Sequence, residues 1–252
     1  MESIARVMER IEALGMGGVV TTDADGTLWS GDVGVDVFEA LLESKGVREE
    51  ARDALVSEAR WASVSIEGDI HEVARRLWES TIAGAYPEDR CYEMMAWAFA
   101  GWRLDEAFDF ARRVREQRGL RDRIHPEMSV MVAWMRKRGL ELWVVSASPL
   151  FMVQAGVELL GIEATRVIAA SPEVRAGRLA PRMAAPIPYG QGKVRGVEGA
   201  VGDREVVAAF GDEMFDLEML ARARVPVAVR PKPRLRGRAA ELPSLVELGR
   251  DG

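Results

Sequence analysis

Several features that define large classes of protein are scarce or missing in this sequence. The single cysteine, Cys91, excludes a disulfide within the chain and any metal cluster built from cysteines, so we expect a cytoplasmic protein. No run reaches the roughly 18 to 20 consecutive apolar residues that a bilayer-spanning helix needs. The stretch from Met1 to Leu14 also lacks the apolar segment of a signal peptide. We therefore expect a soluble protein with no membrane partner.

An excess of positive charge is missing too. The formal net charge is −6, and prolines interrupt the Arg-rich stretch 230–238. This balance opposes binding to the phosphate backbone, so we expect no nucleic-acid partner. The chain has 252 residues, of which 48% are hydrophobic and 29% are charged. It is long enough for one large domain or two smaller ones.

The first third of the chain combines one strand with a series of helices. Residues 19–22 form a short apolar run typical of a buried strand, and it leads directly to Asp23. Strand signals then disappear between residues 32 and 119. Asp69 and Glu72 have the spacing of a capping box, and Ala/Glu/Arg-rich and amphipathic stretches predict four or five helices. We interpret residues 32–119 as an inserted all-helical cap domain.

From residue 120 onward, helix and strand patterns alternate. Pro126 is typical of a helix start, and Ser148 with Pro149 predicts a helix that Ser148 caps. The expected strands are 140–145, 167–170, 206–210 and 225–229, with a hairpin at 174–179. Such alternation indicates a parallel sheet with crossover helices. The predicted fold class is therefore α/β, with a Rossmann-like three-layer parallel-sheet core formed by residues 1–31 and 120–252.

Polar residues occur at the ends of the predicted core elements, where open α/β sheets bind ligands. They are Asp23, Asp25, Ser146, Lys193, Asp212 and Asp216. Three carboxylates around one point suit a hard divalent cation such as Mg²⁺, which prefers oxygen ligands. A lysine and a serine hydroxyl suit the anionic oxygens of a phosphorylated substrate.

These residues carry a resemblance to a known family. Asp23-Ala-Asp25-Gly-Thr-Leu, Ser146, Lys193 and Gly211-Asp212-x-x-x-Asp216 match, in order, the four motifs of haloacid-dehalogenase-superfamily phosphatases. The chain most resembles the phosphoserine-phosphatase-like branch, in which a helical cap is inserted after the first motif. The resemblance covers nearly the whole chain in layout, although only about 15 residues carry its specificity.

The resemblance implies a hydrolase that removes phosphate from a small phosphorylated metabolite. It implies that Asp23 attacks phosphorus and forms an aspartyl-phosphate, while Asp25 acts as general acid and then as general base. Asp23, the main-chain carbonyl of Asp25, and Asp212 would hold Mg²⁺, with Asp216 bound directly or through water. Ser146 and Lys193 would bind the phosphoryl group. Because Asp25 must carry a proton, we expect it to have a higher pKa than Asp23.

The sequence leaves the substrate open. Phosphoserine is one candidate, and Asp32, Arg75 and Arg76 are candidate substrate contacts. Glu213 and Phe215 depart from the family pattern, as does Ala147-Ser148, where Gly-Gly is usual. Alternatives are a phosphatase for phosphocholine or phosphoethanolamine and a non-catalytic phosphoryl-binding regulatory protein.

The predicted cap also contains four tryptophans, and the sequence does not set the state of assembly. Trp61, Trp78, Trp97 and Trp102 are interpreted as cap core, with a cation–π cage as the alternative. We expect a monomer or a homodimer.

Overall fold

The structure is a computed structural model that describes residues 3–15 and 17–249. Residues 1, 2, 16 and 250–252, which the predicted core includes, lie outside the described residues. In the part of the chain that is described, no helix has the length and apolar character to cross a bilayer. The strands are β1 (Val19–Thr22), β2 (Glu141–Pro149), β3 (Val167–Ala170), β4 (Pro172–Arg175), β5 (Arg178–Met183), β6 (Val206–Gly211), β7 (Val225–Val229) and β8 (Val246–Leu248).

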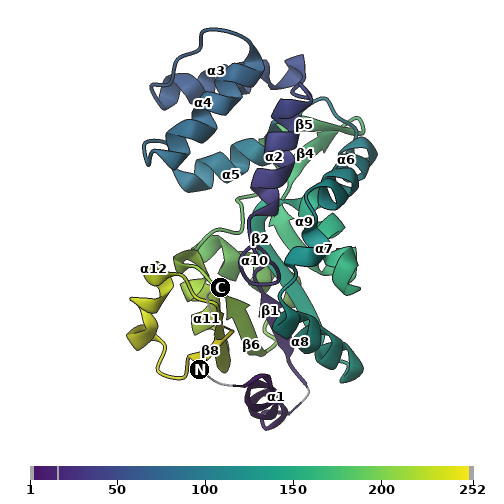
Figure 1. Ribbon diagram of the computed structural model, residues 1–252, viewed down its shortest axis with the longest axis vertical. Coiled ribbons are helices and arrows are strands. Elements are labelled where there is room, and N and C mark those ends of the chain that lie inside the picture. The colour runs from purple at the N-terminus through teal and green to yellow at the C-terminus, as the bar shows by residue number, and fades with distance from the viewer. Residues whose placement is uncertain (1–2, 16, 250–252) are drawn as a thin grey trace.

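Helices surround the sheet and fill the segment between β1 and β2 (Figure 1). The α-helices are α1 (Ile4–Glu12), α2 (Val33–Glu43), α3 (Arg52–Trp61), α4 (Ile70–Ile82), α5 (Glu88–Trp97), α6 (Leu104–Gln117), α7 (Leu120–Arg123), α8 (Pro126–Lys137), α9 (Leu150–Val157), α10 (Gln191–Val201), α11 (Leu217–Ala221) and α12 (Pro233–Arg236). The short 3-10 helices are η1 (Glu49–Ala51), η2 (Glu158–Leu160), η3 (Ala164–Arg166), η4 (Met214–Asp216) and η5 (Ala239–Glu241).

Six strands form one parallel sheet in the order β3-β2-β1-β6-β7-β8. The chain runs from β1 outward through β2 to β3 and then returns to place β6 on the other side of β1. The strand order therefore reverses between β1 and β6, and the carboxyl ends of these two strands flank the crevice where α/β sheets bind ligands. This sheet confirms the predicted fold class.

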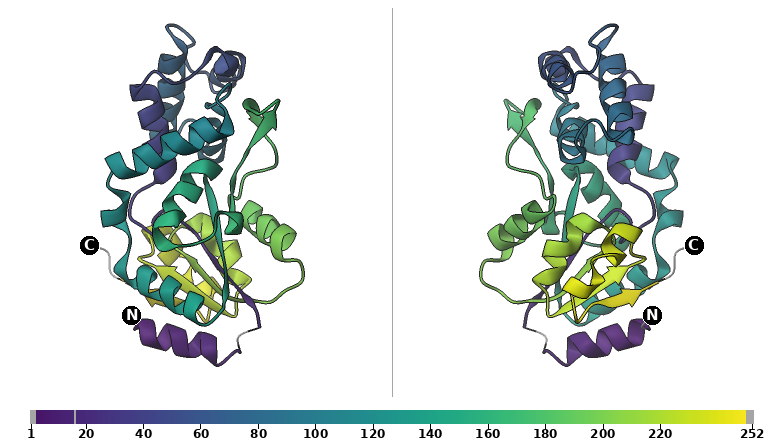
Figure 2. Two further views of the ribbon diagram at one scale, coloured as in Figure 1. Left: turned by 90° about the vertical axis from the view of Figure 1, so that its right-hand side faces the viewer. Right: turned by 90° about the vertical axis from the view of Figure 1, so that its left-hand side faces the viewer.

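Alternate residues of the strands enter two separate apolar layers. Val20 and Val144 belong to the cluster that includes residues of α1, α8 and α9. Their neighbours Val19 and Val145 belong to the cluster that includes residues of α10, α11 and α12. Since successive side chains of a strand point to opposite faces, the sheet is covered on both sides. Figure 2 shows these helices on the two faces of the sheet.

The segment between β1 and α7 is helical throughout, apart from its loops. The capping box predicted at the start of α4 is present, because Asp69 accepts hydrogen bonds from the first-turn amides and Glu72 accepts one from Asp69 N. The β4–β5 hairpin extends toward this segment (Figure 2), and Leu179 exchanges main-chain hydrogen bonds of 2.9 and 2.8 Å with Gly101 and Trp102. The division into a core and a cap domain remains a prediction.

Two local predictions need correction. The strand expected at 140–145 runs on to Pro149, so α9 begins at Leu150 and has no side-chain cap. Ser148 therefore does not cap a helix. A second difference lies at the C-terminal side of the sheet, where β8 pairs with β7 although the sequence pattern predicts no strand there.

Candidate active site

The loop after β1 is held against the loop after β6. The amide of Asp23 donates to Phe210 O at 2.8 Å, which continues the pairing of the two strands past their regular ends. Gly26 has φ +84°, and a Cβ at this position would overlap Asp212 Oδ2. Glycine is therefore required here both for the turn and for the close approach of a carboxylate.

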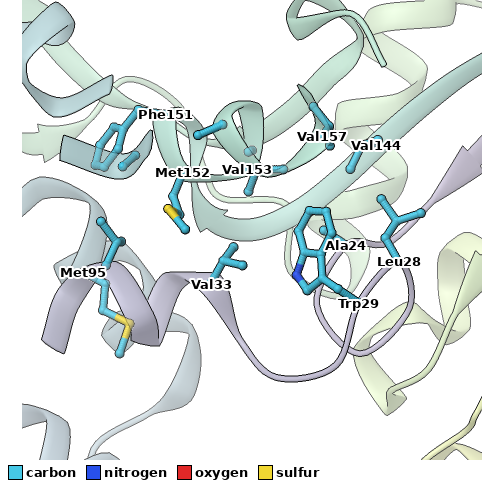
Figure 3. Close-up of a cluster of buried hydrophobic side chains, with 14 of the residues drawn as sticks. Ala24, Leu28, Trp29, Val33, Met95, Val144, Phe151, Met152, Val153 and Val157 are labelled. Atoms are coloured by element: carbon cyan, nitrogen blue, oxygen red, sulfur yellow. The ribbon is translucent and has the colours of Figure 1, made fainter. Parts of the chain in front are cut away.

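A buried tryptophan anchors the same loop to α9. The side chain of Trp29 is fully buried, and Figure 3 shows it beside Val153 and Val157 of that helix, with Ala24 and Leu28 in the same cluster. A Cβ on Gly156 would lie 2.8 Å from Trp29 Cη2, so the helix presents bare backbone to the indole ring. This packing fixes the loop that carries both aspartates of the first motif.

Three aspartates and one lysine meet at the carboxyl ends of β1 and β6. Carboxylate oxygens of Asp23, Asp212 and Asp216 lie within 4.8 Å of one another, and all three residues are buried. Lys193, from the first turn of α10, places Nζ 2.5 Å from Asp23 Oδ1 and 2.5 Å from Asp216 Oδ1. The side chain of this lysine is fully buried, and the negative charges of Asp216 and Asp23 raise its pKa despite burial. It therefore remains an ammonium ion at neutral pH.

The other two carboxylates of the cluster are held by the loop after β6. Asp216 Oδ2 accepts the amides of Asp212 and Glu213 at 3.1 and 3.0 Å. Asp212 accepts from Thr27 Oγ1 at 3.2 Å and pairs with Lys232 Nζ at 3.2 Å. Because Lys193 binds the other oxygen of Asp216, both carboxylate oxygens of this residue have donors. Asp212 is held by Thr27 of the loop after β1 and by Lys232.

One oxygen of the cluster lacks a partner in the described part of the chain. Asp23 Oδ2 is buried and accepts no hydrogen bond from the described residues. A buried carboxylate oxygen without a donor is costly, and a divalent cation coordinated by oxygen ligands would satisfy it. The donor set and this open oxygen therefore fit a hard cation such as Mg²⁺ bound by Asp23 and Asp212.

Asp25 stands apart from this cluster and receives four donors. Its Oδ1 accepts from Trp29 Nε1 and from the amide of Val33, both at 2.8 Å. Its Oδ2 accepts from Ser148 Oγ at 2.7 Å and from Ser146 Oγ at 3.4 Å. An indole N–H and an amide cannot accept a hydrogen bond, whereas a hydroxyl can reverse its role. A proton on Asp25 therefore fits only on Oδ2, facing the serines.

Burial dominates the acid–base properties of the site. It raises the pKa of Asp23 and of Asp25 to about 7 in each case. It also raises the pKa of Asp212 to about 8, with the charges of Asp23 and Asp216 acting in the same direction. The sequence predicts a higher pKa for Asp25 than for Asp23. The structure does not show this difference, because burial raises the pKa of both aspartates to about the same value.

The two serines after the middle of β2 lie side by side at Asp25. Ser146 and Ser148 are both 1% exposed, and the amide of Ser148 donates to Ser146 Oγ at 3.1 Å. Ser148 Oγ also lies 3.5 Å from Asp32 Oδ1. Asp32 caps α2 by accepting from Val35 N at 2.9 Å. Of the three candidate substrate contacts, Asp32 thus lies next to the Asp25 group.

The two candidate arginines contact other parts of the helical segment. Arg76 donates to the main-chain carbonyls of Ser65 and Glu67 in the loop between α3 and α4. Arg75 is exposed on α4. The contacts found within the described chain do not bring either side chain to the aspartates, and their role with substrate remains a prediction.

The four tryptophans do not face one common point. Arg90 stacks over Trp61 with 4.0 Å between the guanidinium carbon and the ring centroid, and Arg48 covers Trp102 at 4.7 Å. Trp97 is buried in the main apolar cluster. Trp78 and Trp102 pack against the same cluster, as expected of cap core, whereas Trp61 is 56% exposed, so the prediction of a core position is wrong for Trp61.

Several residues at the site were missed by sequence reasoning. Ser148 gave a misleading helix-cap signal, and Lys232 lies in an Arg/Pro-rich stretch that indicated no site. An aromatic row of Tyr92, Tyr189 and Phe215 extends from α5 to η4, with ring centroids 6.3 and 4.9 Å apart. Only Phe215 carried a signal, as a departure from the family pattern.

Fold and site together define an α/β protein with an acidic, cation-competent centre at the switch point of its sheet. Residues 20–221 match the haloacid dehalogenase-like hydrolase family model, and the chain belongs to this family. The predicted superfamily and the predicted hydrolase class are thereby confirmed. No curated protein matches the sequence.

Solved structures share the fold at low sequence identity. A protein of unknown function from Bordetella pertussis Tohama I is 20% identical with a TM-score of 0.71, over 92% of this chain and 97% of its own. A probable phosphoserine phosphatase from Vibrio cholerae is 18% identical with a TM-score of 0.58, over 91% of this chain and 60% of its own. A substrate-bound phosphoserine phosphatase is 15% identical with a TM-score of 0.51, over 89% of this chain and 98% of its own. At these identities the similarity concerns the fold.

Proposed function

We propose that the protein is a Mg²⁺-dependent phosphatase that hydrolyses a small phosphomonoester through an aspartyl-phosphate. One observation carries this proposal: the buried Asp23 Oδ2 has no partner among the described residues, yet it lies in a cluster with Asp212, Asp216 and an ammonium group. Asp23, the main-chain carbonyl of Asp25, and Asp212 would hold the cation. Asp216 would orient a metal-bound water or bind directly, and donors on both of its oxygens favour the first arrangement.

The residues divide the reaction between them. Asp23 attacks phosphorus, so that the bond from its oxygen to phosphorus forms while the bond to the leaving oxygen breaks. Asp25 gives its Oδ2 proton to that leaving oxygen, and it then accepts a proton from the water that releases phosphate and regenerates Asp23. Lys193 and Ser146 bind the phosphoryl oxygens. Bound Mg²⁺ supplies the positive charge that lets an anionic nucleophile approach a phosphate dianion.

Phosphoserine is the first substrate to test, because the fold matches that of phosphoserine phosphatases over most of the chain. Phosphocholine and phosphoethanolamine are the second candidates, and the carboxylate of Asp32 beside Asp25 favours an amine-bearing substrate in either case.

The geometry favours catalysis over a non-catalytic phosphoryl-binding protein. The ring of Phe215 packs against Tyr189 at 4.9 Å. Glu213 accepts from the amide of Met214 at 2.7 Å and lies 3.5 Å from Lys232 Nζ. The Phe215 ring also lies 5.1 Å from Lys193 Nζ, and the Glu213 amide donates to Asp216 Oδ2. Both residues therefore border the catalytic group. Within the described residues neither side chain forms a hydrogen bond with Asp23 or Asp25, and we infer that they leave the reaction intact.

Phosphate release from a panel of phosphomonoesters tests the proposal. We expect turnover with Mg²⁺ and none after chelation, and loss of turnover in Asp23→Asn. Asp203→Asn is a matched control, because Asp203 is exposed beyond α10. A wild-type protein that releases no phosphate from any ester would refute the proposed function. Activity that survives Asp23→Asn would remove the covalent step while leaving hydrolysis standing.

A further inference from the structure

A cavity of about 190 Å³ lies among the helices between β1 and β2. It is lined by residues of α2, α4 and α5 and opens to solvent, and these helices lie together in the upper part of Figure 1. Asp32 and Glu88 contribute the only acidic side chains of its lining, Trp78 and Tyr92 contribute rings, and Val35, Thr81, Ile82, Cys91 and Met95 complete it. We call it the α2–α4–α5 pocket.

The pocket adjoins the group around Asp25. Asp32 belongs to its lining, and Ser148 Oγ lies 3.5 Å from Asp32 Oδ1 and 2.7 Å from Asp25 Oδ2. On the opposite side, Glu88 accepts a hydrogen bond of 2.8 Å from Tyr189 OH, in the loop that leads to Lys193. The pocket therefore adjoins Asp25, the residue proposed to protonate the leaving group of the substrate.

The lining of the pocket is acidic and holds no basic side chain. Burial raises the pKa of Asp32, and an ammonium group placed beside this carboxyl group would oppose that shift and favour its ionised form. No lysine, arginine or histidine lines it, and in the described part of the chain neither Asp32 nor Glu88 forms an ion pair. Their partners are neutral donors: Tyr92 OH donates to Asp32 Oδ2 at 2.9 Å, and Tyr189 OH donates to Glu88. Burial and the charges of both carboxylates raise the pKa of the Cys91 thiol. The pocket is thus selective for cations and unfavourable for a carboxylate.

The remaining walls suit a cation that carries alkyl groups. Ring faces of tryptophan and tyrosine attract ammonium groups, and desolvated sites strengthen that attraction. Val35 and Met95 offer apolar contact to methyl or methylene groups, and Ile82 is 69% exposed at the rim. A sugar hydroxyl would find few hydrogen-bonding partners on such walls, and an acid would be repelled.

We propose that the α2–α4–α5 pocket holds the alkylammonium group of the substrate and excludes substrates that place a carboxylate there. The claim that this group belongs to a phosphomonoester rests on the proposed function. The pocket uses Trp78 alone of the four tryptophans, together with Tyr92 and the two carboxylates, so it differs from the tryptophan cage considered for the sequence. It places phosphocholine and phosphoethanolamine ahead of phosphoserine as substrates.

Paired substrates isolate the charge. Phosphocholine and 3,3-dimethylbutyl phosphate have nearly the same shape and differ by the positive charge, and we expect kcat/KM to be at least tenfold higher for phosphocholine. Phosphoethanolamine and phosphoserine differ by the carboxylate, and we expect phosphoethanolamine to be the better substrate. Equal values within each pair, or a preference for phosphoserine, would overturn the inference while the phosphatase assignment stands.

Two variants test the pocket itself. Glu88→Gln removes one charge while its amide oxygen can still accept from Tyr189, and Ile82→Arg adds a positive charge at the exposed rim. Each should lower the phosphocholine to dimethylbutyl ratio at least threefold. Asp89→Asn removes the same charge from an exposed neighbour outside the lining and should leave the ratio unchanged. A ratio that does not respond to Glu88→Gln and Ile82→Arg would refute the assignment of the pocket.

Binding of choline separates this inference from the proposed function. Calorimetric titration of the full chain with choline should show one site that is weakened in Glu88→Gln and kept in Asp89→Asn. Such binding without any phosphate release would refute the phosphatase assignment and support the pocket. Phosphate release without detectable choline binding, and without charge preference among substrates, would refute the pocket and support the phosphatase assignment.

Discussion

Replacement of Ser148 by alanine tests whether this residue holds the proton of the general acid. The Asp25 carboxylate has donor-only partners on Oδ1, Trp29 Nε1 and Val33 N, so its proton belongs on Oδ2. Ser148→Ala removes the 2.7 Å contact on that oxygen and leaves the 3.4 Å contact with Ser146. The variant therefore perturbs the acid without touching the nucleophile or the cation-binding cluster.

The size of the effect follows from this hydrogen bond. A hydrogen bond to a charged group contributes about 1.5–3 kcal/mol, which corresponds to a loss of roughly 10- to 100-fold in kcat. Poor leaving groups need protonation more than good ones do. We therefore expect the full loss for alkyl phosphates and a much smaller loss for an aryl phosphate such as p-nitrophenyl phosphate.

The pH profile supplies an independent readout. The hydrogen bond from Ser148 lowers the pKa of Asp25 against the effect of burial. Its loss should raise that pKa, so the alkaline limb of kcat/KM, where Asp25 loses its proton, should move to higher pH. Steady-state phosphate release across the pH range measures both effects. Ser171→Ala is the control, because Ser171 follows β3 and its hydroxyl donates to the main-chain carbonyl of Ala169 within that strand. An unmoved limb, together with equal losses for alkyl and aryl esters, would refute the role given to Ser148.

Two further predictions concern the cation-binding cluster and the buried Asp25. Gly26→Ala should cost about 1–2 kcal/mol of stability, because Gly26 has a left-handed backbone. It should also raise the Mg²⁺ concentration needed for activity, because the new Cβ displaces Asp212. The control Gly84→Ala, at φ +75° with open space around the Cβ, should lower the melting temperature without changing the Mg²⁺ requirement. An equal Mg²⁺ requirement in the two variants would contradict the close approach. In the metal-free protein, Asp25 has a folded pKa of about 7, above its unfolded value, so its stabilising contribution is present below the unfolded pKa and is lost as pH rises through 7. Between pH 6 and pH 8 the folded protein binds on average roughly half a proton more at Asp25 than the unfolded chain does. The free energy of unfolding should therefore fall by about 1.4 kcal/mol over these two pH units. The melting temperature of the metal-free protein should therefore fall over this range, and Asp212 should add to the fall. Mg²⁺ should raise the melting temperature more at pH 8 than at pH 6. A metal-free protein that is more stable at pH 8 than at pH 6 would contradict the pKa directions.

The sequence predicted the parts of the fold whose signals are local. Apolar runs bounded by turn residues placed β1 and β7 at the residues where the structure has them, and Pro126 marked the start of α8. Four polar strand ends in a fixed order indicated the cluster of Asp23, Lys193 and Asp212, because the carboxyl ends of parallel strands meet at one edge. Residue order was enough for these features.

Other features depend on pairing or packing across long stretches of the chain. Ser148 reads locally as a helix cap because it precedes Pro149, and its contact with Asp25 arises only because β2 pairs in parallel with β1. The strand β8 has three residues, too few for a periodic signal, and it forms by pairing with β7. The α2–α4–α5 pocket takes its lining from three helices, none of which alone carries a binding pattern.

Asp32 connects these distant features. As the cap of α2 it orients the first helix after the catalytic loop, as the acceptor of Tyr92 OH it ties α5 to α2, and through Ser148 it lies one hydroxyl away from Asp25. A cation in the pocket would therefore lie close to the carboxylate that faces the general acid. Because a nearby positive charge stabilises the carboxylate that forms as Asp25 gives up its proton, filling the pocket should make Asp25 a stronger acid as well as bind the substrate. Phosphocholine should then gain over 3,3-dimethylbutyl phosphate in kcat as well as in KM, whereas a pocket that only anchors the leaving group would change KM alone.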